Sequence, residues 1–146
     1  MRRFFSLYLG LFLLAGILRA EVSKPRSLVL TSQENGTEPQ GIFSCSGTIH
    51  GYLVLPKTAV GKHALEAIWI KPNGKIASHS RNEVDFAPPG RSTAYVWFAF
   101  PERSALPEAV DTIQDQERLT YNGQWRLQVR WDDQSLLQSK FIVRCQ

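Results

Sequence analysis

The stretch YNGQWRLQVRWDDQSLLQSKFIVRC, residues 121–145, decides the fold. From Gln124 to Trp131 polar and apolar residues alternate strictly, with the apolar set at odd positions. This period of two predicts a half-buried β-strand. Residues 132–134 (DDQ) favour a turn, and apolar residues return at odd positions after them. The stretch therefore predicts a β-hairpin that ends at a buried cysteine, Cys145.

Outward from this hairpin, short apolar segments are separated by turn signals. Candidate strands cover residues 27–32, 41–55, 63–71, 76–80, 82–86 and 93–100. Residues 56–62 are predicted to form a polar connector, and Pro88-Pro89-Gly90 to end a strand. The run TAYVWFAF, residues 93–100, is the most hydrophobic of this region and predicts a central strand.

These segments amount to about seven or eight strands, with at most a short helix between residues 108 and 119. They predict an all-β fold, an antiparallel β-sandwich. The pattern resembles immunoglobulin-like modules of exported bacterial proteins, through Gly-x-Trp-x-Leu-x-Val at 123–129 and Phe-x-Val at 141–143. The resemblance covers the whole chain after residue 20, implies an architecture, and carries no functional residues across. Unlike antibody-type domains, this chain has no tyrosine two positions before Cys145.

The first twenty residues have the features of a secretory signal peptide. Arg2 and Arg3 precede an apolar run from Phe4 to Leu18, and Ala20 is a small residue suited to cleavage. The alternative is an uncleaved anchor, but a span needs about 20 apolar residues and this run is shorter. We therefore expect a protein exported to the periplasm or secreted, with residues 21–146 forming one domain.

The charge balance gives no reason to expect a nucleic acid as partner. Three of the 17 basic residues lie in the signal segment, so 14 basic residues face 13 acidic ones in the mature chain. The net charge thus falls from +4 to +1. A nucleic-acid-binding domain normally carries a strong positive charge. The membrane is expected as a partner only through the signal peptide during export.

Two cysteines remain in the mature chain, Cys45 and Cys145. In an exported protein a lone pair predicts a disulfide bond. Two free thiols or an intermolecular bridge are the alternatives.

The sequence carries no set of residues that fits a catalytic or metal site. The three histidines, His50, His63 and His79, form no compact ligand motif, although folding could bring the first two together on neighbouring strands. Asp132 and Asp133 lie in a turn, where aspartate is common for local reasons. No nucleophile, base and oxyanion donor stand in a known arrangement. We therefore predict no catalytic residues, no metal and no cofactor.

A binding surface is the remaining function, and three places are candidates for it. Trp131 ends its strand beside a turn, which predicts partial exposure. Arg126 and Arg130 lie on the outward face of the same strand. The charged stretch from Pro101 to Thr120, with Glu108 and Asp111, is long for a loop and so a candidate contact segment.

We hypothesise an exported, non-catalytic β-sandwich that binds another protein or a cell-envelope component. One alternative is a carbohydrate or small-ligand module that uses an exposed tryptophan. Another is a small exported enzyme or metal-binding protein. The sequence leaves the oligomeric state open, as well as glycosylation of Asn35 in its Asn-Gly-Thr pattern.

Overall fold

The computed structural model describes residues 27–102 and 116–146. Nearly all of this part of the chain is β-structure, with one short helical segment at 116–119. The strands are β1 (Ser27–Thr31), β2 (Ile42–Ser44), β3 (Thr48–Ile70), β4 (Ile76–Ala99), β5 (Gly123–Trp131) and β6 (Ser135–Arg144). In the described residues, no helix has the length and apolar character needed to cross a membrane.

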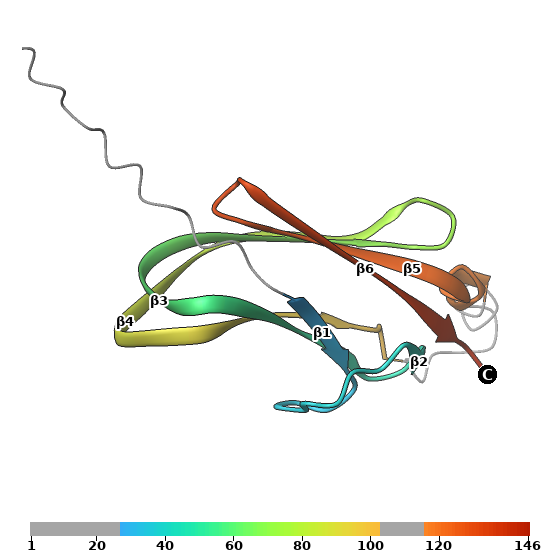
Figure 1. Ribbon diagram of the computed structural model, residues 1–146. Helices are drawn as coiled ribbons and strands as arrows, with labels where there is room; N and C mark the ends of the chain where they lie inside the picture. Colours follow the sequence, from blue (N-terminus) through green and yellow to red (C-terminus); the bar gives the residue numbers. More distant parts are fainter. Residues whose placement is uncertain (1–26, 103–115) are drawn as a thin grey trace, which may run out of the picture.

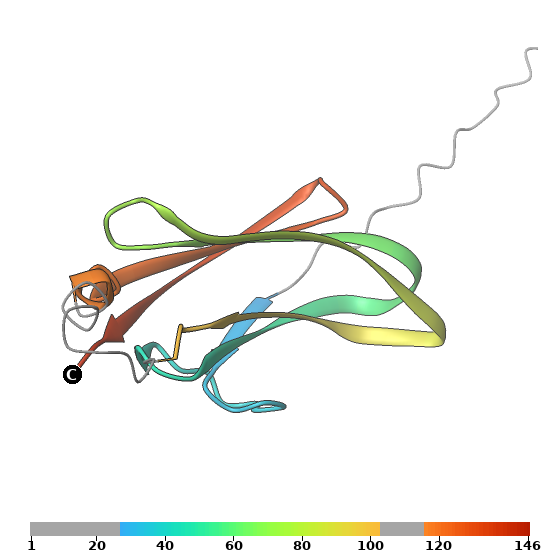
Figure 2. The same ribbon diagram turned by 180° about the vertical axis from the view of Figure 1, so that it is seen from behind.

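Two strands, β3 and β4, are long enough to run through both layers of a sandwich (Figures 1 and 2). The first half of β3 pairs with β1 and with the second half of β4. The second half of β3 pairs with the first half of β4 and with β5. β6 continues the second layer beyond β5, and β2 pairs with β6 in parallel. The chain is therefore a single sheet folded over on itself.

The fold-over occurs where β3 and β4 bend together. The register between them shifts on either side of Ala59, which pairs with Arg91. Gly61 and Gly90 flank this bend, with φ of 83° and 88°, a region that favours glycine. A side chain at Gly90 would collide with the carbonyl oxygen of Ala59. The two strands can approach this closely because one of them carries no Cβ there.

The core lies between the layers and is rich in aromatic rings. Most apolar residues at odd positions of the terminal hairpin belong to it, with Trp125 and Leu127 fully buried, and Leu137 packs against it. The buried indole of Trp125 donates a hydrogen bond to the carbonyl oxygen of Tyr121 (2.7 Å), so its polar atom is satisfied. Phe98 from β4 packs against Trp69 of β3 and against Trp125. Rings from both layers thus meet in the centre.

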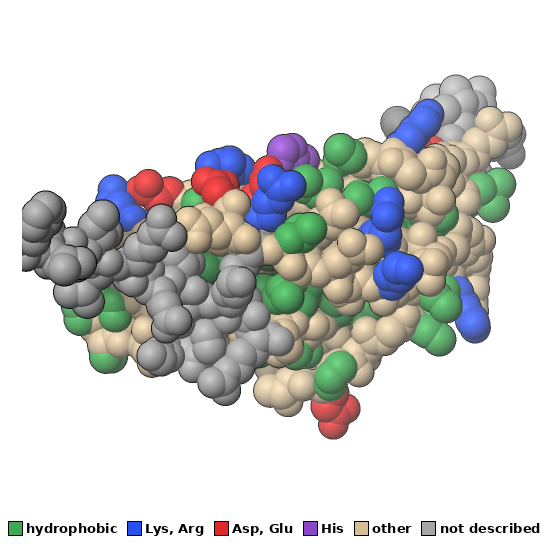
Figure 3. Space-filling view, turned by 45° about the horizontal axis from the view of Figure 1, so that its top comes forward, with side chains coloured by type: hydrophobic (Ala, Val, Ile, Leu, Met, Phe, Trp, Pro, Cys, Tyr) green, Lys and Arg blue, Asp and Glu red, His purple; other side chains and the backbone are tan. Residues whose placement is uncertain are grey.

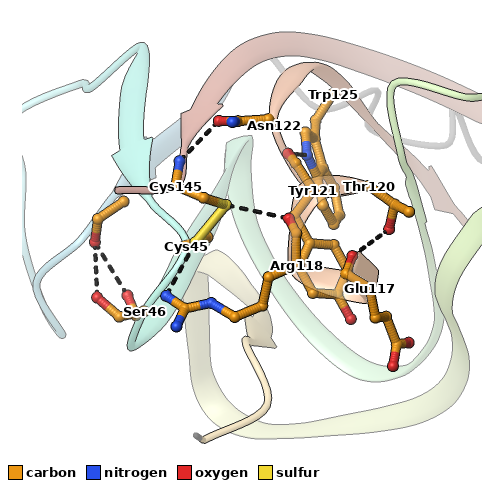
Figure 4. Close-up of a disulfide and its surroundings, with 10 residues drawn as sticks. Cys45, Ser46, Glu117, Arg118, Thr120, Tyr121, Asn122, Trp125 and Cys145 are labelled. Carbon is orange, nitrogen blue, oxygen red and sulfur yellow. Dashed lines mark hydrogen bonds between the residues drawn. A yellow bond between two sulfur atoms is a disulfide. The ribbon is translucent and has the colours of Figure 1, made fainter. Parts of the chain in front are cut away.

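The predicted disulfide joins Cys45 to Cys145, whose Cα atoms are 5.0 Å apart (Figure 4). Each cysteine directly follows one strand of the parallel pair, since Ser44 lies opposite Arg144 at its end. Arg118 lies over the bond, with its guanidinium 3.5 Å from the Cys45 sulfur. The bond closes a loop of 100 residues, for which the chain-entropy model gives about 4 to 5 kcal/mol. A disulfide is typical of an oxidising compartment, in agreement with export.

The all-β prediction is confirmed, with three differences in detail. Of the predicted short strands between residues 41 and 100, the start of the first is β2 and the rest are parts of β3 and β4, so six strands replace seven or eight in the described residues. The predicted connector 56–62 and the predicted stop at 88–90 both lie inside strands, at the bend. Moreover, one strand pair, β2 with β6, is parallel.

The bend provides a test of the fold with a matched control. Gly90→Ala places a Cβ against the Ala59 carbonyl at a positive φ, and should lower the free energy of unfolding by about 3 kcal/mol or more. Gly61→Ala meets a similar φ but has nothing within 4 Å of its Cβ, so it should cost only about 1–2 kcal/mol. Urea denaturation of both variants measures this difference. Equal losses would mean that the close approach at Gly90 does not limit the fold.

Candidate ligand-binding face

Four ring side chains share the outer surface of the layer formed by β1 and the halves of β3 and β4 that pair with it. Alternation on β4 directs Val96 inward and its neighbours Tyr95 and Trp97 outward. The register sets His50 opposite Trp97, and Tyr52 opposite Tyr95. Cross-strand neighbours on one face lie close together. We call these four residues, His50, Tyr52, Tyr95 and Trp97, the aromatic face.

The rings of the aromatic face are in contact and accessible. Tyr95 and Trp97 are nearly parallel, with centroids 5.4 Å apart and planes 15° apart. Tyr95 also contacts Tyr52 (5.2 Å) and stacks on His50 (5.8 Å). Trp97 is 58% exposed, whereas the other three tryptophans are at most 2% exposed. Trp97 is thus the one tryptophan that a ligand can reach.

Hydrogen bonds fix two of these rings in place. Tyr95 Oη lies 2.6 Å from His50 Nδ1, and Tyr52 Oη accepts a hydrogen bond from the Asn35 backbone N–H at 2.6 Å. The loop that carries Asn35 is itself tied to β1, because Gln40 N–H donates to the Leu30 carbonyl oxygen (2.7 Å). The face is therefore ordered before any ligand arrives, which reduces the entropy that binding costs.

A groove of about 330 Å³ lies beside the aromatic face. It is lined by Glu34, Asn35, Tyr52, Val84, Phe86, Arg91, Thr93, Ala94 and Tyr95. Ring faces, an amide, a hydroxyl and one charged group of each sign thus stand around the same space. This mixture of apolar surface and a few polar groups is typical of small-molecule sites.

The electrostatics of the face keep its central phenol neutral. Burial, together with the neighbouring Tyr52 and Glu34, raises the pKa of Tyr95 above the usual value of 10.0. At neutral pH Tyr95 therefore holds its proton and can donate it to the His50 ring nitrogen.

The predicted partial exposure of Trp131 is wrong. Trp131 is 2% exposed, because it shares the inward parity of Trp125 and Leu127. The bend of β3 also carries His63 over its ring, at 4.6 Å between centroids. His63 Nδ1 lies 2.9 Å from a carboxylate oxygen of Asp132, which closes this end of the sandwich. Trp131 is therefore a core residue and cannot form a ligand platform.

Arg126 and Arg130 lie on the exposed outer surface of β5, as their parity predicts. The Arg130 guanidinium is directed to Glu66, with Nε 3.8 Å from Oε2, and the other oxygen of Glu66 is 2.8 Å from His79. Figure 3 shows basic and acidic side chains interspersed over part of this layer, with a histidine among them. Arg130 thus belongs to a solvated network of paired charges, whereas Arg126 lies opposite another basic residue, Lys140.

The three histidines do not come together. His50 and His63 lie on the same strand, β3, in different layers, and His79 pairs with Glu66. Within residues 27–102 and 116–146, no three His, Cys, Asp or Glu side chains are placed to hold a metal ion. Glu108 and Asp111, the other predicted surface residues, lie outside the described residues, as do the predicted signal peptide and most of the predicted contact loop.

Sequence reasoning missed the aromatic face because it assigned residues 93–100 to the core as a whole. In TAYVWFAF both parities are largely apolar, so alternation does not reveal which side faces water. The polar residues opposite them, such as His50, carried the only signal. Thr48 and His50 are polar and lie on one face of β3, which indicates that this face meets water. The side chains of the paired strand β4 that point to the same face are then exposed as well.

The comparisons add no family. No protein-family model matches the sequence, and no curated protein is significantly similar to it.

Among solved structures, segments of larger proteins show a weak likeness. A candidate β-galactosidase from Bacteroides fragilis is 13% identical, with 80% of this chain and 16% of that one covered and a TM-score of 0.46. A glycosyl hydrolase family 2 member from Bacteroides cellulosilyticus is 12% identical, with 80% and 14% covered and a TM-score of 0.45. A β-glucosidase from Listeria innocua, in complex with gluconolactone, is 10% identical, with 80% and 16% covered and a TM-score of 0.42. This chain spans less than a fifth of the length of each of these proteins, and a likeness this weak says nothing of its function.

The raised pKa of Tyr95 predicts a pH dependence of stability. Above pH 10 the unfolded chain releases the Tyr95 proton while the folded protein retains it, so the free energy of unfolding falls as pH rises. We expect this fall between pH 10 and about 11 to be smaller in Tyr95→Phe than in the wild type. Burial also raises the pKa of Tyr121, which contributes equally to both proteins. Urea denaturation across this range measures the two slopes, and identical slopes would contradict the assignment.

Proposed function

We propose that this protein is an exported, non-catalytic β-sandwich module that binds carbohydrate through the aromatic face. The observation that carries the proposal is the exposed Trp97, held beside Tyr95 on an ordered surface. The other three tryptophans are buried in the core, whereas Trp97 is 58% exposed to water. Exposed aromatic clusters of this kind mark interaction sites.

The chemistry of the face suits sugars. A sugar ring presents C–H groups on its faces, which pack against aromatic rings, and hydroxyls at its rim, which need polar partners. Tyr95 and Trp97 offer the flat apolar surface, and the groove offers Asn35, Glu34 and Arg91 as hydrogen-bonding groups. A planar carboxylate or guanidinium can engage two neighbouring hydroxyls at once.

Sheet stability alone does not account for the face. Cross-strand aromatic pairs contribute roughly 0.2–1 kcal/mol to a sheet, and smaller residues with a high β-propensity would serve as well. An indole exposed to solvent gives up most of the burial that a tryptophan can contribute. Its position beside preordered rings is better explained by a ligand.

The hypothesis of a protein or envelope partner remains compatible with this proposal, since polysaccharides are envelope components. Its contact segment, Pro101 to Thr120, lies largely outside the described residues. The aromatic face is the stronger candidate because its geometry is defined.

The proposal predicts that binding depends on Trp97. On an array of neutral glycans (cellulose, maltose, xylan, mannan and chitin oligosaccharides) and anionic ones (galacturonan, alginate and hyaluronan), we expect the wild type to bind at least one series. Trp97→Ala should weaken that binding about ten- to a hundredfold, since a central aromatic contact is worth about 1.4–2.8 kcal/mol. Calorimetry with the bound glycan measures the change.

The matched control is Leu136→Ala, which removes an exposed apolar side chain from β6 in the other layer and should leave affinity unchanged. Both variants should unfold within about 1 kcal/mol of the wild type. A wild type that binds none of these glycans, or equal binding by Trp97→Ala, would contradict the proposed function.

A further inference from the structure

The groove beside the aromatic face has a second compartment. A recess of about 160 Å³ opens on the other side of Tyr95, next to Trp97. Its lining consists of Leu65, Ser78, Ser80, Asn82, Tyr95, Val96 and Trp97. Tyr95 lines both hollows, so they are neighbours along one path.

The topology explains why the two hollows form a line. In the described residues β4 pairs only with β3, so β4 is an edge strand in both layers. The fold-over sets the first half of β4 against its second half along this open side. Residues 78, 80 and 82 border the recess, and residues 84 and 86 border the groove. From Ser78 to Phe86 the path is roughly 26 Å long at about 3.3 Å per residue, much longer than one sugar ring.

The recess differs from the groove in charge. Besides Tyr95 and Trp97, its polar residues are two serines and one asparagine, and none of its lining residues is charged. The groove carries one acidic and one basic group, Glu34 and Arg91. Hydroxyls and amides form hydrogen bonds with sugar hydroxyls, whereas a ligand carboxylate buried here would need a cationic partner.

From this continuity and this chemistry, we infer that the ligand is the interior of an extended, uncharged polysaccharide chain. The inference rests on the proposed function. One stretch of the chain lies across Trp97 and Tyr95, and the next follows the open edge of β4, where its hydroxyls bond with Ser78, Ser80 and Asn82. A single sugar or disaccharide fills only the aromatic part.

A peptide strand is the other occupant that an open sheet edge could take, since edges offer unpaired backbone groups. The recess favours a glycan because, beside the aliphatic Leu65 and Val96, its lining consists of hydroxyls, an amide and ring surfaces rather than a row of apolar pockets. Ser78 and Ser80 are half-buried beside the indole of Trp97, where a hydroxylated chain would meet them together with the ring.

The test uses the mature protein and the neutral oligosaccharide series that it binds on the array, with two to six sugar units. We expect the hexasaccharide to bind at least about tenfold more tightly than the disaccharide, because it reaches both compartments. The double variant Ser78→Ala/Ser80→Ala should weaken hexasaccharide binding about tenfold, as expected for two hydrogen bonds, and leave disaccharide binding unchanged. Ser92→Ala, an exposed serine of β4 that lines neither hollow, is the matched control.

The outcomes separate this inference from the proposed function. Glycan binding that Trp97→Ala abolishes, but that shows equal affinity for short and long oligosaccharides, would overturn the inference and keep the proposed function. A preference for the anionic series, or no effect of the double serine variant on the hexasaccharide, would also overturn it. Absence of all glycan binding would overturn both, and an extended peptide partner would then be the better account of the open edge.

Discussion

The bend shared by β3 and β4 is the constraint on which the rest of the structure depends. These strands carry the chain from one layer to the other, so the sandwich exists only if they turn together. Two glycines in the left-handed region flank the turn, and a Cβ at Gly90 would meet the Ala59 carbonyl. Because β4 lies at the edge of both layers, the same bend creates the open side along which the aromatic face and both hollows lie.

The two ends of the sandwich are closed by different means. At the bend, His63 covers Trp131 and pairs with Asp132, in a turn whose two aspartates have positive φ. At the opposite end, the disulfide follows the parallel pair of β2 and β6. Because it closes a long loop, it strongly reduces the conformational entropy of the unfolded chain. The outer surface of the β1 layer is left with rings, while the outer surface of the second layer carries ion pairs on β3 and β4 and one between Arg130 of β5 and Glu66. Function is therefore assigned to the first surface.

The sequence predicts correctly those features that follow from strict alternation of polar and apolar residues or from the chemistry of a cysteine pair. The terminal hairpin, its inward residues and the disulfide are examples. The prediction fails where two features of the sequence favour different structures. Trp131 has inward parity and a turn beside it, and parity decided its burial because the sheet fixes side-chain direction. Pro88 and Pro89 predict a strand end, yet a proline is tolerated on an edge strand, where no ladder bond is lost. Trp97 lay in a run apolar on both faces, so only the fold could show which side met water.

The indole N–H groups of the four tryptophans report most directly on the central claim, that the aromatic face is the ligand site. Each gives its own signal in a two-dimensional ¹H–¹⁵N NMR spectrum, and a neutral hexasaccharide that binds on the array can be titrated against them. The account predicts a shift of the Trp97 indole, with the buried indoles of Trp69, Trp125 and Trp131 unmoved. An unmoved Trp97, with shifts instead at Arg126 and Arg130 on the outer surface of β5, would contradict it.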